Sequence, residues 1–244
     1  MHRVYIEPEN IFKTEITFPA EQSHRISKVL RLKVGDSVIV FDGLGKEYRV
    51  TLDKIKNQNI RAAIESMTVI NRDPKWEITL LQGLPKFGKM DFIVQKATEL
   101  GVKRIIPIIT DRTIPQLTSQ KVKTRIERWQ KIAISAAEQS GRTVIPSIST
   151  IINFEEGLEE IKSCELKLFF WEEERENKLK TILRKINQIT SVAVIIGPEG
   201  GFTEEEAELA KQFGAISVTL GSQLLRTETA PITALSIFLY EFSE

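Results

Sequence analysis

The chain has 244 residues, of which 41% are hydrophobic, and this is enough for a sizeable core in one large or two smaller domains. The net charge of +1 is too small to indicate a partner, and the single cysteine, Cys164, excludes an intramolecular disulfide and is typical of a reducing cytosol. No apolar run is long enough to cross a bilayer, the N-terminus lacks the apolar stretch of a signal peptide, and the two histidines, His2 and His24, form no metal-ligand pattern. We therefore expect a cytoplasmic protein with no membrane segment and no metal.

Residues 1–72 are predicted to be rich in β-strands. Two strand-like runs flank the sequence DGLG, which is a common hairpin turn. One short helical segment is predicted at residues 21–35. Its predicted apolar face consists of Ile26, Val29 and Leu30. A polar, proline-containing stretch at residues 71–76 marks the expected end of this first domain.

The helical segment of the first domain also concentrates positive charge. Five basic residues and no acidic one lie within ten positions: His24, Arg25, Lys28, Arg31 and Lys33. A charged helix face is ordinarily only solvated. This density is also typical of a track that contacts the phosphates of RNA.

The second predicted domain, residues 73–244, alternates strands with helices. Strands are predicted at 76–84, 102–109, 166–171, 191–196 and 215–220, and helices at 89–100, 119–140, 176–189, 203–213 and 229–242. Strands separated by helices favour parallel pairing, with helices on both faces of the sheet. The sequence therefore predicts an α/β domain.

A glycine-rich loop, GPEGG, follows the predicted strand 191–196 and leads into a helix that begins with three glutamates. Thr203 and Glu206 have the spacing of a capping box, so the helix start is already neutralised and is a poor phosphate site. The phosphate-binding patterns GxxxxGK[ST] and GxGxxG are absent from this loop. The residues alone favour a neutral or positively charged ligand. S-adenosylmethionine, a nucleoside or an amino acid would each fit.

A second loop, LGSQLLRTETA, follows the last predicted strand and enters the closing helix. Ligands of open α/β sheets bind beyond the carboxyl ends of strands, where both loops are expected. The alternative is structural: Thr229 would begin the helix and Arg226 would pair with Glu228 at the surface. Because a second glycine loop is expected beside it, we favour a functional role.

Five segments in order resemble the RsmE family: HRISKVLRLKVGD, LPKFGKMDFIVQKATELGV, RWQKIAISAAEQSGR, IIGPEGGFTEEE and LGSQLLRTETA. Members of this family are S-adenosylmethionine-dependent methyltransferases of the SPOUT class that act on uridine N3 of 16S ribosomal RNA. The resemblance covers nearly the whole chain, and the last two segments are the most specific. One departure is Ser222-Gln223, where the family usually has Pro-Arg.

The resemblance implies a fold and an assembly. It implies a C-terminal SPOUT α/β domain with a parallel sheet and a deep trefoil knot, preceded by a small N-terminal PUA-like β-barrel. It also implies a homodimer with the closing helix in the interface. That helix carries apolar residues on nearly every side, as a buried or partnered helix would. They are Ile232, Leu235, Ile237, Phe238, Leu239 and Phe242. A core helix of a monomer is the alternative.

The family's site residues are transferred to matching positions of this sequence. The S-adenosylmethionine contacts expected are Ile196, Gly197, Pro198, Glu199, Gly200, Gly201, Leu220, Gly221, Leu225, Arg226, Thr229 and Ala230. As the uridine loses its N3 proton, negative charge spreads onto the flanking carbonyl oxygens, and Arg226 is the predicted cation that stabilises it. Glu199 or Glu228 is the predicted proton acceptor, and the sequence does not choose between them.

RNA contacts are expected from the basic helical segment and from four further residues: Lys86, Lys89, Arg112 and Arg142. The expected partner is 16S rRNA or the assembled 30S subunit. Three other functions are weighed. The loops alone would equally suit another RNA position, and a knot protein that binds RNA without catalysis is a further alternative. A phosphate-ester enzyme is disfavoured because three glutamates follow the glycine loop and no P-loop lysine is present.

Overall fold

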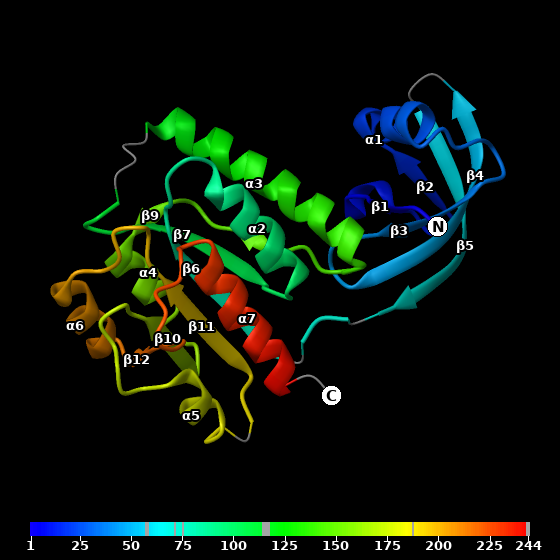
Figure 1. Cartoon of the computed structure of the whole chain (residues 1–244). Helices are drawn as coiled ribbons and strands as arrows, with labels where there is room; N and C mark the ends of the chain where they lie inside the picture. Colours follow the sequence, from blue (N-terminus) through cyan, green and yellow to red (C-terminus); the bar gives the residue numbers. More distant parts are fainter. Residues whose placement is uncertain (57–58, 71, 75, 114–117, 187, 243–244) are drawn as a thin grey trace. The chain divides into compact units, whose positions relative to one another are not determined.

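The computed structural model describes the chain except residues 57–58, 71, 75, 114–117, 187 and 243–244. Packing divides it into two compact units (Figure 1): Met1–Asp73 with Ala137–Ile145, and Pro74–Ala136 with Pro146–Glu244. The predicted domains, 1–72 and 73–244, stay a prediction. Among the helices in the described part of the chain, none has both the length and the apolar character needed to span a membrane.

The N-terminal unit is built on one five-stranded sheet in the order β1-β3-β4-β5-β2. Its elements are β1 (Arg3–Tyr5), the 3-10 helix η1 (Pro8–Asn10), β2 (Glu15–Phe18), α1 (Ala20–His24), the π-helix η2 (Arg25–Val29), β3 (Ser37–Phe41), β4 (Lys46–Lys56) and β5 (Asn59–Val69). The sheet curls on itself in Figure 1, and register shifts between β4 and β5 contribute to this curvature.

The predicted hairpin is confirmed. Strands β3 and β4 pair antiparallel. In the turn between them, the Asp42 carboxylate accepts backbone hydrogen bonds from Leu44 at 2.8 Å and Lys46 at 3.0 Å. Gly43 and Gly45 adopt positive φ angles of 75° and 108°, which are costly for other residues. The aspartate and the glycines that predict a turn in the sequence therefore form the turn in the structure.

The predicted apolar face of the short helical segment is partly wrong. Ile26 is fully buried and Leu30 packs against the same core, but Val29 is 65% exposed. The segment is a π-helix here, since the Leu30 N–H donates to the Arg25 carbonyl five residues earlier, at 2.9 Å. This wider turn rotates Val29 away from the face that an α-helix would give it.

The C-terminal unit contains a sheet in the order β12-β10-β11-β6-β7-β8, and β9 also pairs with β7. Every pair in it is parallel, as predicted. Its strands are β6 (Glu77–Gly83), β7 (Arg104–Ile109), β8 (Ser147–Ile148), β9 (Ile152–Asn153), β10 (Leu166–Phe170), β11 (Ser191–Ile196) and β12 (Ile216–Val218). Its helices are α2 (Lys89–Glu99), α3 (Ser119–Ser140), α4 (Phe154–Glu160), α5 (Leu179–Leu183), α6 (Glu204–Gln212) and α7 (Thr229–Phe242). The last turn of α3 groups with the N-terminal unit.

Two helices differ from the sequence-based expectation. The helix predicted at 176–189 is only the five residues of α5, which has no side-chain cap and buries only Leu179 and Leu183. Residue 187 lies outside the described residues. Helix α4 was not predicted, although Asn153 and Glu156 form a capping box at its start. A search for this four-residue signal would have found it.

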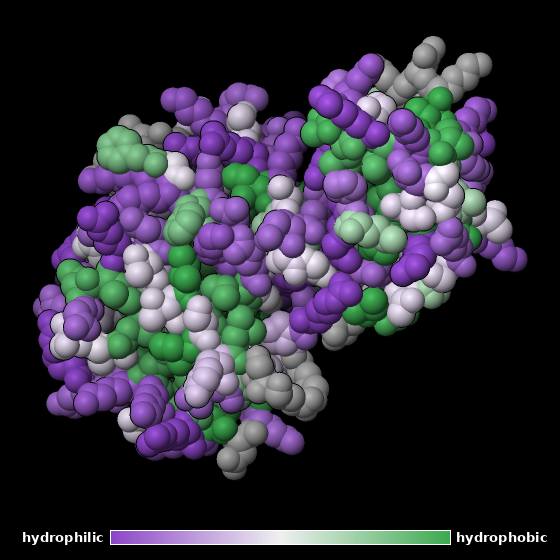
Figure 2. Space-filling model, turned by 45° about the vertical axis from the view of Figure 1, so that its right-hand side comes forward, coloured by the Kyte–Doolittle hydropathy of each residue, from purple (hydrophilic) through white to green (hydrophobic). Residues whose placement is uncertain are grey.

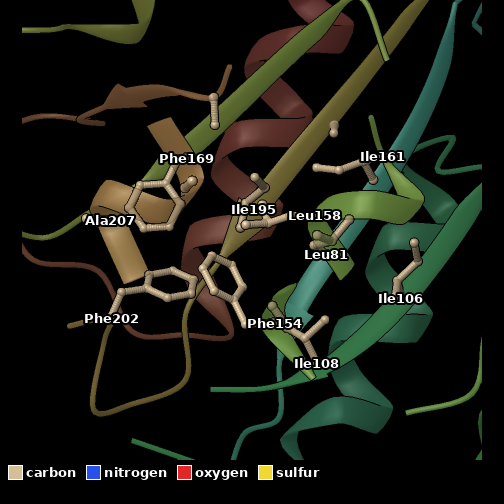
Figure 3. Close-up of a cluster of buried hydrophobic side chains, with 13 residues drawn as sticks. Leu81, Ile106, Ile108, Phe154, Leu158, Ile161, Phe169, Ile195, Phe202 and Ala207 are labelled. Carbon is tan, nitrogen blue, oxygen red and sulfur yellow. The ribbon is translucent and has the colours of Figure 1, made fainter. Parts of the chain in front are cut away.

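A cluster of buried apolar side chains lies between the sheet and helices α4 and α6 (Figure 3). Phe202, which follows the glycine loop directly, packs its ring 4.5 Å from that of Phe169 and 5.2 Å from that of Phe154. Large aromatic rings contribute strongly to a core. The end of the glycine loop is thus fixed to the centre of the domain.

Candidate functional site

Three segments of the C-terminal unit meet beyond the carboxyl ends of its strands. Gln82, at the end of β6, donates from its side-chain amide to the Gly83 carbonyl at 3.0 Å and to Thr227 Oγ1 at 3.1 Å. Thr227 Oγ1 in turn donates to the Gly197 carbonyl at 2.6 Å. Gln82 and Thr227 are both buried. This network joins the glycine loop to the loop before α7, as the sequence predicts for the two loops, and adds the end of β6 to them.

Glycines allow the loops to approach this closely. A Cβ on Gly83 would lie 2.5 Å from both the nitrogen and Cδ of Pro198, and a Cβ on Gly197 would lie 3.0 Å from the Phe202 ring. Gly201 has a positive φ of 68°. Its missing Cβ is the space that the Glu172 carboxylate occupies. The loop therefore needs glycine for close contact at some positions and for backbone conformation at another.

The two predicted proton acceptors lie on either side of one lysine. Lys89 Nζ is 2.9 Å from Glu199 Oε1 and 3.1 Å from Glu228 Oε2. The Lys86 backbone N–H also points at the Glu199 carboxylate, with both oxygens at 3.2 Å. Lys86 and Lys89 were predicted as RNA contacts. The structure shows that Lys89 is an ion-pair partner of both carboxylates.

These contacts change the proton affinity of the groups. Burial raises the pKa of Glu199, but hydrogen bonds from Lys89 and from backbone N–H groups outweigh it and leave this pKa below its ordinary value. The hydrogen bond to Glu199, followed by the interaction with Glu228, raises the pKa of Lys89. Glu199 and Lys89 are therefore both charged at neutral pH.

Arg226 is exposed, one residue before the buried Thr227. Glu228 pairs with Lys89, so the surface pair of Arg226 with Glu228 that the structural alternative required is not formed. Within the described residues, Arg226 has no ion-pair partner. Its guanidinium lies two residues before Glu228 in the chain and is open to a ligand.

Arg112 and Glu172 border the glycine loop from the segments that follow β7 and β10. Arg112 Nη1 donates to the Gly200 carbonyl at 2.9 Å and lies 3.8 Å from Glu172 Oε1. Arg112, predicted to contact RNA, thus supports the loop. Sequence reasoning missed Gln82, Thr227 and Glu172. Polar residues that follow or end a strand of an open α/β sheet are the signal that could have found them.

The predicted capping box at the start of α6 is confirmed. The Glu206 N–H donates to Thr203 Oγ1 at 3.2 Å, and the Thr203 N–H donates to Glu206 Oε2 at 2.9 Å. Glu206 Oε1 also accepts from the Asp111 N–H at 3.0 Å. Burial is the main reason that the pKa of Glu206 is raised. An acid of the helix itself occupies this terminus, which leaves no phosphate site.

The other predicted cofactor residues lie along the same two loops. Ile196 ends β11, Leu220 and Gly221 follow β12, and Thr229 and Ala230 form the first turn of α7. Leu225 is half-buried, whereas Ser222 and Gln223, where the sequence departs from the family pattern, are exposed. The departure therefore changes a surface position of the loop and leaves the hydrogen-bonded part intact.

The predicted RNA-binding residues of the N-terminal unit differ in their exposure and in their ion pairs. Four are exposed: His24, Lys28, Arg31 and Lys33. Arg25 instead pairs with Glu138, whose side chain is 5% exposed, at 2.6 Å. Among the described residues, four of these basic side chains are therefore unpaired and exposed, whereas Arg25, whose side chain is 39% exposed, is held by Glu138.

The RNA contact predicted for Arg142 stays a prediction, and the structure shows this side chain buried in an ion pair. Its side chain is 5% exposed, and Nε and Nη2 each lie 2.7 Å from the Asp73 carboxylate. Arg142 follows Gly141, which has a positive φ of 80° after α3 and turns the chain inward. This buried, doubly bonded guanidinium therefore helps to hold the N-terminal unit together.

The assembled loops suit a ligand without phosphates. They combine a glycine cradle, two carboxylates and a buried amide oxygen, Gln82 Oε1, that has no hydrogen-bond partner among the described residues. A buried polar atom of this kind calls for a donor from a ligand or water. Within the same residues, no group of His, Cys, Asp and Glu has the arrangement of a metal site. A flat nucleoside that carries positive charge fits these features.

Comparison with protein families gives two matches. Residues 71–239 match the RNA methyltransferase domain family, and residues 18–65 match the RNA methyltransferase PUA domain family. Among curated proteins, the chain is 32% identical to ribosomal RNA small subunit methyltransferase E of Bacillus subtilis, over 91% of this chain and 88% of that protein. It is 33% identical to the protein of the same name from Rickettsia conorii, over 96% and 93%.

Solved structures share the fold over almost the whole chain. The ribosomal RNA small subunit methyltransferase E of Neisseria gonorrhoeae, bound to S-adenosylmethionine, has a TM-score of 0.87 and 34% identity, and the match covers 98% of this chain and 97% of that one. A methyltransferase from Legionella pneumophila in complex with S-adenosylmethionine has a TM-score of 0.89 and 32% identity, with the same coverage.

Proposed function

The chain belongs to the RsmE family of ribosomal RNA small subunit methyltransferases, and from this we propose that it methylates N3 of a uridine in 16S ribosomal RNA with S-adenosylmethionine as donor. The observation that carries the proposal is the network of Gln82, Thr227 and Gly197. It holds the glycine loop and the loop before α7 together over the end of β6. Both loops on which the family resemblance depends therefore form one site.

When bound, S-adenosylmethionine supplies a methyl group that is already activated by the sulfonium. The protein mainly has to align the reacting atoms. Residues 196–201 and 220–230 would hold the cofactor. The glycines of the first loop let Phe202, Arg112 and Glu172 pack against its backbone and so fix its shape. Arg226 would stabilise the negative charge that spreads over the uracil carbonyl oxygens as the N3 proton leaves. Its exposed guanidinium, which is not consumed by an ion pair within the described residues, supports this role.

RNA recognition is proposed to use both units. The exposed basic residues of α1, η2 and the following loop would contact phosphates, which give affinity and register but no sequence information. Choice of the uridine would then depend on its fit to the loop site after it rotates out of the RNA stack.

A homodimer is proposed from the closing helix α7. Leu235 and Phe238 are fully buried, but Ile232, Ile237 and Leu239 are only partly buried and Tyr240 is 84% exposed. Figure 2 shows hydrophobic side chains at the surface of the C-terminal unit. The trefoil knot and the cytoplasmic location expected for a ribosome-modifying enzyme belong to the same proposal.

The test is incubation of the purified protein with 30S subunits and labelled S-adenosylmethionine, followed by mass analysis of the modified nucleosides. We expect label in 3-methyluridine at one position. Label in a ribose methyl group or in methylguanosine would place the reaction at another RNA position. Tight cofactor binding or RNA binding without any label would indicate an RNA-binding protein without this activity.

A further inference from the structure

The sequence left open which of two carboxylates accepts the uridine proton, and the contacts of Lys89 separate them. We propose that Glu228 is the proton acceptor, that Glu199 is a structural ligand of the loop, and that Lys89 is the positioning residue that holds both. This inference rests on the proposed function and deepens it.

Both carboxylate oxygens of Glu199 already face hydrogen-bond donors of the protein. Its Oε1 bonds to Lys89 Nζ at 2.9 Å, and both of its oxygens lie 3.2 Å from the Lys86 N–H. A carboxylate that accepts from a cation and from a backbone donor is a weaker base than one with fewer donors. Glu199 therefore anchors the glycine loop to the loop between β6 and α2.

Glu228 has one oxygen left over. Its Oε2 is buried and faces Lys89 Nζ at 3.1 Å, with no other partner among the described residues. Its Oε1 makes no hydrogen bond within those residues. The side chain is 18% exposed, and none of that exposure comes from Oε2. The oxygen that faces away from the lysine can therefore meet a substrate that enters beside Arg226, two residues earlier.

The position of Lys89 supports a special role. It is the first residue of α2, after the left-handed N-cap Gly88, where the helix dipole disfavours a cation. Two carboxylates from distant loops compensate this unfavourable placement. A residue that violates a local preference and is compensated by long-range contacts is typical of functional sites.

The proton balance is simple. The N3–H bond of the uridine breaks, its electron pair stays on nitrogen as the nucleophile, and the proton passes to Glu228, which becomes a neutral carboxyl group. Lys89 keeps its own proton because its pKa is raised. After the reaction, Glu228 releases the proton to water.

The experiment compares Glu228→Gln, Glu199→Gln, Lys89→Met and Lys89→Arg in single-turnover methylation of 30S subunits from acid to alkaline pH. Lys96→Met is the matched control, since Lys96 lies on the same helix and pairs with Glu99 at 2.8 Å. We expect Glu228→Gln to be about 100- to 10,000-fold slower at neutral pH and to recover at alkaline pH, where solvent ionises N3 without a base. Glu199→Gln should mainly weaken binding of S-adenosylmethionine, measured by calorimetry, without alkaline recovery.

Lys89→Met should be about 100-fold slower because the two carboxylates lose their alignment. The acid limb of its pH profile should move to higher pH, because repulsion between two carboxylates raises the pKa of one of them. Lys89→Arg should move the limb back. Carboxyl titration of the cofactor-free protein by NMR gives the same shift without any turnover.

Three results would overturn the inference: a Glu228→Gln variant as fast as wild type, alkaline recovery in Glu199→Gln instead, or carboxyl titrations that Lys89→Met leaves unmoved. Failure of the proposed function is distinct, since wild-type protein would then yield no 3-methyluridine at all.

Discussion

Gly83→Ala offers a direct test of the close approach that builds the cofactor loop. Gly83 does not have a positive φ, so alanine is compatible with its backbone, and the cost is steric. The new Cβ would lie 2.5 Å from both the nitrogen and Cδ of Pro198, whereas ordinary contact begins at 3.4 Å. The neighbour is backbone and a proline ring, which cannot rotate away. The loop must therefore move by about 0.9 Å, and overpacking of this kind costs about 1–3 kcal/mol.

This free-energy cost should lower either the affinity for the cofactor or the thermal stability of the protein. If the loop shifts, the affinity for S-adenosylmethionine measured by calorimetry should fall by about 5- to 150-fold. If the loop stays, the thermal unfolding midpoint should drop by about 2–4 °C for each kcal/mol. Gly157→Ala is the matched control. Its Cβ would lie 2.8 Å from Cγ2 of the buried Ile108, in the hydrophobic core and not in either loop, so a loss of stability is expected there without a loss of cofactor affinity. Unchanged affinity and unchanged midpoint in Gly83→Ala would refute the reasoning.

Four further predictions concern charged residues. Arg226→Ala should slow methylation about 100- to 1,000-fold while cofactor binding survives, because it acts on charge that develops during the reaction; near-wild-type turnover would contradict its assigned role. Lys28→Glu should weaken RNA binding and make it less sensitive to salt, so that the negative slope of log affinity against log salt becomes shallower by about 0.7 or more. Arg25→Ala, in contrast, should cost about 1–3 kcal/mol of unfolding free energy, because the buried Glu138 carboxylate loses a partner; a changed salt slope without lost stability would reverse these two roles. Burial raises the pKa of Glu47, but its hydrogen bonds with two arginines leave this pKa below its ordinary value. Its contribution to stability is thus present above the unfolded-state pKa and is lost as the pH falls through the folded-state pKa. Glu47→Gln should therefore unfold at lower urea than wild type at neutral pH, and this difference should vanish in acid; an equal difference at both pH values would be the contrary result.

Several features of the fold could be predicted because their signals are local. The hairpin between β3 and β4 uses a turn sequence that stabilises itself, with Asp42 and two glycines. Helices α3 and α7 begin and end where the sequence predicted, and Thr203 and Glu206 form the capping box that their spacing indicated. Backbone hydrogen bonds over a few residues decide these features, and those residues are adjacent in the sequence.

The errors have equally specific causes. Val29 was assigned to a buried face because the spacing was counted for an α-helix, and the π-helical turn changed it. The ion pair of Arg142 with Asp73, which is far away in sequence, was not anticipated. Spacing cannot show a partner that only folding brings near.

The sequence by itself predicted that the two loops suit a ligand without phosphates, because their glycines and acids are consecutive in the chain. Only the tertiary structure decided how the charges are shared. Lys89 lies 110 residues from Glu199 and 139 from Glu228 in the numbering, yet its ammonium contacts both. Coulomb interactions depend on distance through space. That Glu228 pairs with Lys89 and not with the nearby Arg226 could therefore be known only from the folded chain, in which three strand ends come together.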